Sequence, residues 1–519
     1  MDRVQQWHVY EITLHGLLEY RNPSKDVSVA VTFRGPNDER LEVDAFWDGG
    51  DTWRARFATG TLGTWRWRSV CFNADDYGFH LKAGSFECVP YEGDNPLYRH
   101  GPLRLSADRR SFAHADGTPF FWLGDTVWAG VQKAKLEDWQ RFLEVRRQQG
   151  FTLIQHVLCN WRVFPQDSCG EKAYWEPAGA GSGIKVNPAY FQRLDAKFAA
   201  INAHGLVAAP VILWAIKGAA NPGYTLPEPD AILLARYIVA RYGAYNVAWL
   251  LAGDGDYRGE LAERWRRIGT AVFRGRHDRP VTMHPGGEHW VADEFRDQEW
   301  FDFIGYQSGH GCAPEDWRWL VQGPPAQEWL KPPARPIVNL EPNYEGHIAY
   351  GTQYRFTARD VRRALYWSLL LAPTAGVTYG DHGIWPFPER RELPTDHAYS
   401  GESGPWYEAL YDEGARQLQH LRSLFASLPW WRLRPAPELL AEQPGEADLG
   451  RYITVARSED GGVLLAYLPA GGSIRLQPGA VKGGSASWYN PRTGERQAAR
   501  QEGDSFAAPD EEDWLLVIA

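Results

Sequence analysis

The chain has 519 residues, of which 44% are hydrophobic and 23% charged, and its formal net charge is -10 at pH 7. A chain this long exceeds one ordinary hydrophobic core, so we expect several domains. No basic run offsets the acidic balance, which argues against nucleic acid as a partner. The 25 tryptophans favour a carbohydrate ligand, because sugar rings present apolar C–H faces that stack on aromatic rings.

The amino-terminal segment MDRVQQWHVYEITLHG shows no charged segment followed by an apolar one, so no secretory signal is visible. No apolar run reaches the roughly 18 to 20 residues that a membrane span needs. The 5 cysteines are odd in number and lack CxxC spacing, which is typical of reduced thiols. We therefore expect a cytoplasmic protein without a membrane partner. A secreted chain that had lost its signal would carry the same pattern.

Residues 1–95 are predicted to form an N-terminal β-sandwich. Short β-branched and aromatic segments alternate with period two, and Gly, Asn-Pro or Asp-Gly turns separate them. The clearest are VSVAVTFRG, LEVDAFWDG, TWRARFATG and GTWRWRSVCF. The segment YEGDNPLYRHGPLRL then has the composition of a linker into the next domain.

Residues 96–430 follow a strand–loop–helix order. Eight segments are predicted strands: PFFWLGD, FTLIQHVL, LVAAPVIL, NVAWLLAGD, RPVTMH, FDFIGYQ, RPIVNLE and AGVTYGD. Amphipathic helical segments alternate with them, and three of these end at a glycine, Gly150, Gly205 or Gly243. Eight such units predict a (β/α)8 TIM barrel. A doubly wound sheet is less favoured, because no glycine-rich phosphate loop follows the first strand.

Residues 431–519 return to short β segments, among them YITVARS, GVLLAYLPAG and DWLLVIA. They predict a second, smaller β domain. The predicted fold class is therefore multidomain: a TIM barrel flanked by an N-terminal β-sandwich and a small C-terminal β-sandwich.

Catalytic residues of such a barrel lie at the carboxyl ends of the strands and on the loops that follow them. In this chain those positions hold carboxylates, imidazoles, amides and four tryptophans. The candidates for substrate binding are Asp125, Trp128, His156, Trp161, Trp214, His284, Gln307, Tyr344, His382 and Trp385. Together they predict a sugar pocket.

Two acids are the candidates for catalysis, Asp254 at the end of the fourth strand and Glu341 at the end of the seventh. Period-two alternation puts each acid on one face with its neighbours: Ala248, Leu250 and Ala252 with Asp254, and Ile337 and Asn339 with Glu341. Acids on these two strands can face each other across the barrel mouth. Carboxyls about 5 to 5.5 Å apart are what a retaining glycosidase uses.

Other interpretations of these residues remain open. Asp254 can cap the Gly-Asp-Gly turn in which it lies, and Asp125 can cap a helix. Asp256 and Glu345 are rival acids, but each lies beyond its strand, where loop solvation or binding of substrate hydroxyls is favoured. Any of the four tryptophans can belong to the core.

Metal, cofactor and serine-nucleophile chemistry find little support. The segment HPGGEH has loop glycines and no HExxH helix, so we expect neither a metal nor a cofactor. No GxSxG turn follows a barrel strand. The histidines, His310 included, are predicted to donate hydrogen bonds to sugar hydroxyls or to be satisfied within the barrel.

Several motifs resemble those of the bacterial apiosidase-like glycoside hydrolases. PFFWLGDTVWAG, WLLAGDGD and IVNLEPNYEG resemble the first, fourth and seventh strand ends of that family's barrel. AFWDGGDTWRARF resembles the β-sandwich that precedes the barrel, and WYNPRTGE resembles the terminal β domain. The resemblance covers essentially the whole chain and implies that Asp254 is the acid/base and Glu341 the nucleophile. That family is usually exported, whereas this chain shows no signal.

The sequence thus predicts a retaining, exo-acting glycosidase that releases a terminal sugar from plant- or bacterial-derived oligosaccharides. The sugar is apiose-like or another furanoside or pyranoside. Asp254 would need a raised pKa, which its apolar strand and the charge of Glu341 can supply. The alternatives are a non-catalytic carbohydrate-binding protein on the same fold and a transglycosylase. A binding protein has no need for two opposed carboxylates.

Overall fold

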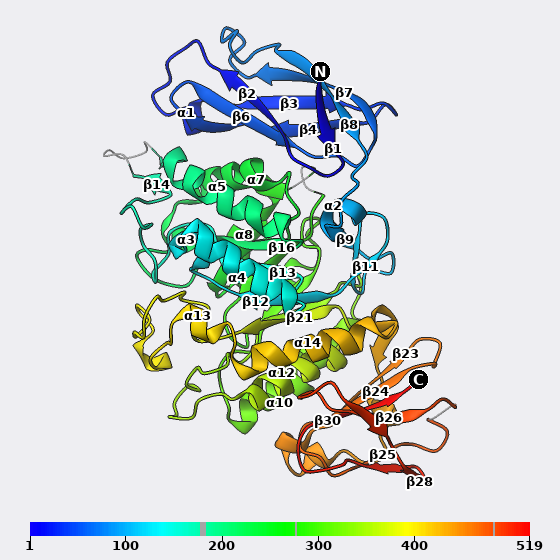
Figure 1. Cartoon of the computed structure of the whole chain (residues 1–519). Helices are drawn as coiled ribbons and strands as arrows, with labels where there is room; N and C mark the ends of the chain where they lie inside the picture. Colours follow the sequence, from blue (N-terminus) through cyan, green and yellow to red (C-terminus); the bar gives the residue numbers. More distant parts are fainter. Residues whose placement is uncertain (177–182, 274, 276–277, 481–482) are drawn as a thin grey trace.

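The computed structural model describes residues 1–176, 183–273, 275, 278–480 and 483–519. Figure 1 shows three bodies in chain order: an N-terminal β domain in blue, a central barrel with its helices in cyan to yellow, and a C-terminal β domain in orange and red. The predicted fold class is confirmed.

The N-terminal domain packs two sheets around one core. The five-stranded sheet has the order β1 (Asp2–Gln5), β8 (Ala83–Val89), β7 (Gly63–Cys71), β3 (Val29–Arg34), β4 (Arg40–Asp44). The three-stranded sheet has the order β2 (Tyr10–His15), β6 (Thr52–Phe57), β5 (Phe46–Gly49). Alternate residues such as Val31, Phe33 and Trp65 are fully buried between the sheets, as period-two alternation requires.

The segment predicted to be a linker is ordered and closes one end of the barrel. It contains α2 (Pro96–His100) and β9 (Leu103–Leu105), and β9 joins a small sheet with β10 (Phe112–His114) and β11 (Pro119–Phe120), which lie beyond the predicted linker. Phe112 packs against Trp122 and Phe303 with ring centroids 5.3 and 5.2 Å away. These contacts plug the amino-terminal end, so the opposite end is left for a pocket.

Eight parallel strands form the barrel, and all eight predicted segments are strands. Their order is β18 (Val281–Pro285), β17 (Trp249–Gly255), β16 (Val207–Trp214), β13 (Leu153–Val157), β12 (Trp122–Thr126), β21 (Gly376–Gly380), β20 (Ile337–Glu341), β19 (Ile304–Gln307). A side chain bridges β18 and β19: the Thr282 hydroxyl donates to the Phe303 carbonyl at 2.6 Å and accepts from the Gly305 amide at 3.0 Å.

Helices cover the outside of the barrel. The longer ones are α4 (Leu136–Gln148), α5 (Pro188–Ala203), α7 (Glu228–Tyr242), α8 (Glu260–Phe273), α10 (Pro314–Gln322), α12 (Ala358–Leu371) and α14 (Glu413–Ala426). Gly150 and Gly205 follow α4 and α5 with φ of 89° and 75°, the left-handed conformation expected at a helix end. Gly243 differs, since it follows α7 with φ of -65°. No described helix is both long and apolar enough to cross a membrane.

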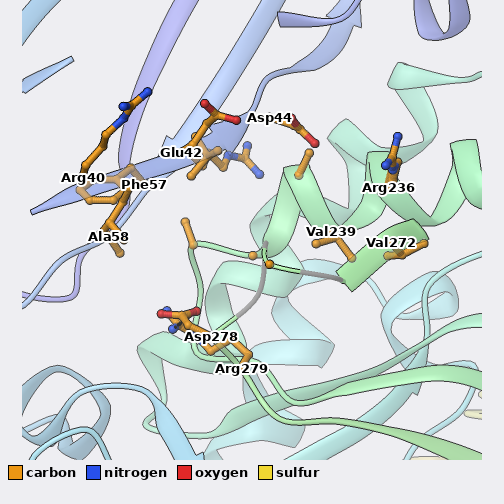
Figure 2. Close-up of a pocket in the computed structure, with 17 residues that line it drawn as sticks. Arg40, Glu42, Asp44, Phe57, Ala58, Arg236, Val239, Val272, Asp278 and Arg279 are labelled. Carbon is orange, nitrogen blue, oxygen red and sulfur yellow. Dashed lines mark hydrogen bonds and ion pairs between the residues drawn. The ribbon is translucent and has the colours of Figure 1, made fainter. Parts of the chain in front are cut away.

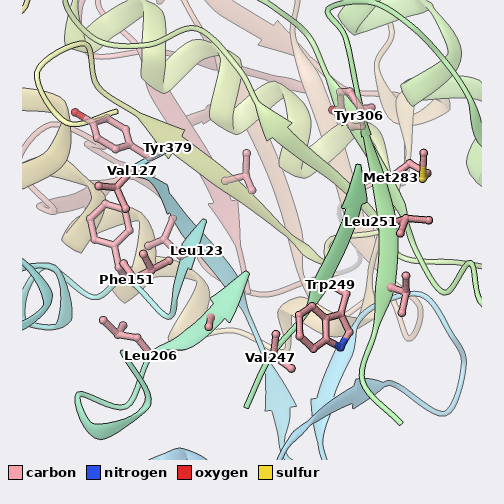
Figure 3. Close-up of a cluster of buried hydrophobic side chains, with 14 of the residues drawn as sticks. Leu123, Val127, Phe151, Leu206, Val247, Trp249, Leu251, Met283, Tyr306 and Tyr379 are labelled. Carbon is pink, nitrogen blue, oxygen red and sulfur yellow. The ribbon is translucent and has the colours of Figure 1, made fainter. Parts of the chain in front are cut away.

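Apolar side chains form two layers, one inside the barrel and one between the strands and the helices. Val211, Leu250 and Val338 belong to the interior cluster. Leu123, Trp249 and Leu251 belong to the outer cluster, which Figure 3 shows between strands and helices.

The C-terminal domain is a second two-sheet body. Its larger sheet has the order β22 (Leu433–Pro435), β23 (Thr454–Ser458), β24 (Leu464–Leu468), β30 (Trp514–Ile518), β26 (Ala486–Tyr489), β27 (Arg496–Ala498). The smaller one has the order β25 (Ser473–Arg475), β29 (Ser505–Ala507), β28 (Gln501–Glu502). A buried ion pair between Arg362 of α12 and Asp513, 2.7 Å long, ties this domain to the barrel. On the other side, Arg241 of α7 pairs with Asp48 of β5 at 2.8 Å.

Candidate active site

A pocket of about 190 Å³ opens at the carboxyl ends of the barrel strands. Eight of the predicted site residues line it: Trp128, Trp161, Trp214, Asp254, Gln307, Glu341, Tyr344 and Trp385. They come from seven different strand ends or the loops after them, which is the position of catalytic residues in this architecture.

Asp254 reaches the pocket through an irregular strand end. The register of β17 against β18 shifts between Leu250 and Gly253 and again between Gly253 and Gly255. Asp254 is therefore an extra residue in β17, with φ of 55°. Such a bulge re-aims a side chain, and bulges are frequent beside active sites.

The two glycines beside Asp254 are required by close packing. A Cβ atom on Gly253 would lie 2.6 Å from the Trp214 ring, and one on Gly255 would lie 2.7 Å from the Tyr257 ring. The Gly255 amide donates to the Tyr257 hydroxyl at 3.1 Å. The Gly-Asp-Gly turn thus positions the carboxyl of Asp254 in the pocket, so the turn is itself part of the candidate site.

Several residues of β17 and β20 face a different side of the strand from the one that simple alternation predicts. Ala252 was expected beside Leu250 in the interior but belongs to the outer cluster, because the bulge breaks the alternation. Ile337 likewise faces outward, and Asn339 bonds to Ser368 of α12. Glu341 enters the pocket because the register of β20 against β19 shifts just before it.

The surroundings of the two acids push their pKa values apart. Burial, followed by the negative charge of Glu341, raises the pKa of Asp254 to about 7. Burial would also raise the pKa of Glu341, but His284 and His310 outweigh it and hold that pKa well below its usual range. At neutral pH Glu341 is therefore ionised, while much of Asp254 still carries its proton.

Two histidines support Glu341. His310 Nε2 donates to Glu341 Oε1 at 3.1 Å. His284 Nε2 lies 3.2 Å from Oε2 without the alignment of a hydrogen bond. Arg162 is the charged group beside the other acid, with Nη2 3.9 Å from Asp254 Oδ2.

The four tryptophans line the pocket and pack on one another. Trp214 lies between Trp128 and Trp161, with ring centroids 5.2 and 4.7 Å away. The Trp128 indole donates to the Tyr344 hydroxyl at 3.0 Å. Among the described residues, neither Trp214 Nε1 nor Gln307 Oε1 has a hydrogen-bond partner, although both atoms are buried. Unpaired buried polar groups are costly, so each of these two atoms has a hydrogen-bonding capacity that the described residues leave unused.

Two expected substrate-binding residues are outside the pocket. Asp125 is fully buried and pairs with Arg146 of α4, whose Nε lies 2.6 Å from Oδ2. His156 is also fully buried, with its ring centroid 5.8 Å from that of Phe198 on α5. Neither residue lines the pocket, because both side chains point from their strands toward the helices rather than into the barrel.

Two others stand one layer behind the pocket. His284 supports Glu341, as described above. His382 accepts from the Trp385 indole through Nδ1 at 3.2 Å, and its Nε2 donates to the Gly401 carbonyl at 2.9 Å. Their geometry makes them supports for lining residues.

The rival acids are engaged elsewhere. Asp256 forms an exposed ion pair with Arg258 at 2.8 Å. Glu345 accepts from the Tyr379 hydroxyl at 2.7 Å and from the Gly414 amide at 3.0 Å. Neither lines the pocket.

Sequence reasoning missed several lining residues, most of them on loops. Among them are Arg162, His347, Tyr350, His397 and Tyr399, the last of which lies in the short 3-10 helix Ala398–Ser400. Arg162 directly follows a predicted residue, Trp161, so adjacency alone would have pointed to it. The others lie on long loops after β20 and β21, where no periodic pattern marks a position. In the described residues, no group of three or more His, Cys, Asp or Glu side chains is placed to hold a metal ion.

A larger cleft of about 480 Å³ lies between the N-terminal domain and helices α7 and α8 (Figure 2). Its chemistry differs from that of the pocket. The positive charges of Arg279 and Arg104 hold the pKa of Asp278, a solvent-exposed acid of this cleft, at about 2. The pocket at the strand ends, with its two differently tuned acids, is therefore the candidate active site.

Family models match nearly the whole chain. The apiosidase-like catalytic domain matches residues 106–432. A domain of unknown function, DUF5060, matches residues 3–72, and the domain described as "Putative collagen-binding domain of a collagenase" matches residues 435–519. No curated protein matches the chain.

Solved structures share the fold. A glycoside hydrolase of family 5 from Bacteroides vulgatus is 22% identical, with a TM-score of 0.70 over 82% of this chain and 95% of that one. A "putative glycoside hydrolase" from the same species is 17% identical, with a TM-score of 0.73 over 100% of both chains. At these identities the likeness concerns the fold, which is that of glycoside hydrolases. The catalytic-domain match spans more than half of the chain, and the chain therefore belongs to the apiosidase-like family.

Proposed function

We propose that this protein is a retaining glycoside hydrolase. The observation that carries the proposal is one pocket with two acids in opposite states, Glu341 held ionised and Asp254 with a pKa of about 7. A retaining glycosidase needs this pair, since one carboxylate attacks while the other acid protonates the leaving oxygen.

The reaction has two steps. The Glu341 carboxylate attacks the anomeric carbon while Asp254 gives its proton to the departing oxygen, so that the glycosidic bond breaks as a glycosyl ester forms. Asp254, now a carboxylate, then takes a proton from water. The resulting hydroxide attacks the anomeric carbon and releases Glu341, and the sugar leaves with its configuration retained.

The size of the pocket supports exo action. Its volume of about 190 Å³ is below the range of about 300 to 1,000 Å³ typical of pockets for larger ligands. Such a pocket suits one terminal sugar better than the middle of a polysaccharide. We propose an apiose-like sugar or another furanose or pyranose, released from plant- or bacterial-derived oligosaccharides. The five cysteines, all in described residues, are free thiols, which favours action in a reducing compartment such as the cytoplasm.

The test is a panel of 4-nitrophenyl furanosides and pyranosides, the apiofuranoside included, with two variants of the protein. Glu341→Ala should abolish turnover of every substrate, because the nucleophile is needed whatever the leaving group. Asp254→Ala should still form the glycosyl-enzyme from a dinitrophenyl glycoside, whose leaving group departs without protonation. The second step of this variant lacks a base and should be slow, so the leaving group should be released in a burst. Azide should relieve the slow step and give a product of retained configuration.

Three outcomes would overturn the proposal. Product of inverted configuration from the unmodified protein would imply a carboxyl separation of about 6.5 to 9.5 Å and a direct attack by water. Full turnover by Glu341→Ala would remove its role as nucleophile. Tight sugar binding without hydrolysis of any substrate would indicate a carbohydrate-binding protein on a glycosidase fold.

A further inference from the structure

Two half-exposed tyrosines stand at the mouth of the pocket. Tyr350 and Tyr399 both line it, yet 49% and 56% of their surfaces are open to solvent. The four tryptophans beneath them are at least 97% buried by comparison. We name Tyr350 and Tyr399 the tyrosine rim. Large aromatic side chains kept at a mouth leave ring surface free for a ligand.

The tyrosine rim is part of a continuous row of rings. From Trp385 the row passes through His397 and Tyr399, with ring centroids 5.0 and 5.5 Å apart. Tyr350 follows at 5.9 Å from Tyr399, and His310, which donates to Glu341, follows at 5.5 Å from Tyr350. The rim therefore connects the wall of the sugar pocket with the support of the nucleophile.

Backbone bonds hold the two rim loops in place. The Tyr350 amide donates to the His310 carbonyl at 2.9 Å. The Ile348 amide donates to the carbonyl of Ser400, the residue after Tyr399, at 3.2 Å. A surface positioned in advance loses less conformational entropy on binding. The rim is thus prepared for a ligand even though its rings are exposed.

The rim also lies close to the reacting groups. Tyr350 and Tyr399 line the same pocket as Asp254 and Glu341. Partial desolvation of each rim hydroxyl raises its pKa, and the charges of the two acids raise it further. A group that leaves toward Asp254 is expected to pass the rim, because the tryptophans beneath it are at least 97% buried. The two ring planes meet at 56°, so they form an angled wall rather than a parallel clamp.

We propose that Tyr350 and Tyr399 form the leaving-group subsite, where a ring with an apolar face stacks as it departs from the glycosidic oxygen. The inference rests on the proposed function and adds a substrate class to it: the terminal sugar is attached to a second sugar or to an aromatic ring, not to a short alkyl group. The mixed polarity of a tyrosine, an apolar face with a hydroxyl at its edge, suits both kinds of ring.

The test separates the leaving group from the terminal sugar. In the inactive Glu341→Gln protein, calorimetry measures the affinity of three glycosides of the sugar identified by the panel: methyl, 4-nitrophenyl and glucosyl. We expect Tyr350→Ala and Tyr399→Ala each to weaken binding of the two ring-bearing glycosides about 5- to 20-fold, the lower part of the range for a stacked ring. Binding of the methyl glycoside should change less than about 2-fold.

Matched variants complete the design. Tyr399→Phe keeps the ring and should retain most of the affinity for the aryl glycoside. Tyr77→Ala removes a tyrosine that is 68% exposed in the N-terminal domain and should change nothing. If only the glucosyl or only the aryl glycoside responds to the rim variants, the subsite stands and its natural occupant is that class of ring.

Two results would refute the subsite while leaving the proposed function intact. One is equal weakening of all three glycosides, which would make the tyrosines part of the terminal-sugar site. The other is unchanged affinity throughout. If no glycoside in the panel is hydrolysed or bound, the proposed function fails first, and the subsite fails with it.

Discussion

Arg162 should set the upper limit of the working pH range. Its Nη2 atom lies 3.9 Å from Asp254 Oδ2, and a positive charge there favours the ionised form of the acid. Asp254 must carry a proton to act as the acid, so kcat/KM should be full below its pKa of about 7 and fall tenfold per pH unit above it. Removing the arginine charge should therefore move this limb to higher pH.

The size of the shift follows from the distance. Two unit charges 3.9 Å apart interact by about 1 kcal/mol at the dielectric constant of water, which is about 0.8 pKa unit. We use the dielectric constant of water, which gives the smallest interaction energy, because Arg162 also faces Asp396 and His397, at 3.3 and 2.8 Å. We expect the limb of Arg162→Leu near pH 8.

The assay is the pH profile of kcat/KM between pH 4 and 10, with the aryl glycoside that the panel identifies. The position of the limb is read independently of the absolute rate, which can also change because Arg162 lines the pocket. Arg162→Lys keeps the charge and is the control, with its limb near that of the unmodified protein. A limb in Arg162→Leu that stays at pH 7 or moves lower would contradict the assignment of Asp254 as the acid.

Three further predictions concern single side chains. Because the pKa of Asp254 rises from 3.8 to about 7 on folding, its contribution to stability is full below pH 3.8 and lost as pH rises through 7. Asp254→Asn should therefore raise the free energy of unfolding by up to about 4 kcal/mol at pH 8 and leave it unchanged at pH 3.5, as measured by urea titrations. Equal effects at both pH values would refute a raised pKa of Asp254 in the folded protein. Asp125→Ala leaves the buried Arg146 without its ion-pair partner, so it should lower the free energy of unfolding by about 3 to 5 kcal/mol and leave KM unchanged. A raised KM in the folded variant would support the prediction that Asp125 binds the sugar. Trp214→Phe keeps the ring but removes the unpaired indole N–H, so sugar affinity by calorimetry should fall about 2- to 12-fold, and no change would mean that water rather than ligand meets this group.

Local patterns in the sequence were enough for the architecture and for the two central acids. Hydrophobic periodicity marked all eight barrel strands, because a strand must bury a fixed face and its ends need turn residues. Catalytic residues of such a barrel lie at the carboxyl ends of its strands, so these patterns also predicted that Asp254, Glu341 and four tryptophans share one rim. Each of these six residues lines the pocket.

The direction of a side chain at a strand end was decided by the tertiary structure. Asp125 and His156 satisfy the same positional rule as Asp254, yet they point toward the helices. Asp254 and Glu341 point into the pocket only because bulges shift the register against the neighbouring strands. A bulge is a property of two paired strands, so alternation within one strand cannot reveal it.

The loops show the same division. Tyr350 and Tyr399 are ordinary tyrosines on aperiodic segments in the sequence. Bonds to His310 and to the neighbouring loop bring them to the mouth of the pocket. The sequence by itself determined which chemistry the barrel rim carries, because strand ends are marked by local pattern. Which of those groups meet a substrate depended on pairing between segments far apart in the chain, and that pairing exists only in the folded molecule.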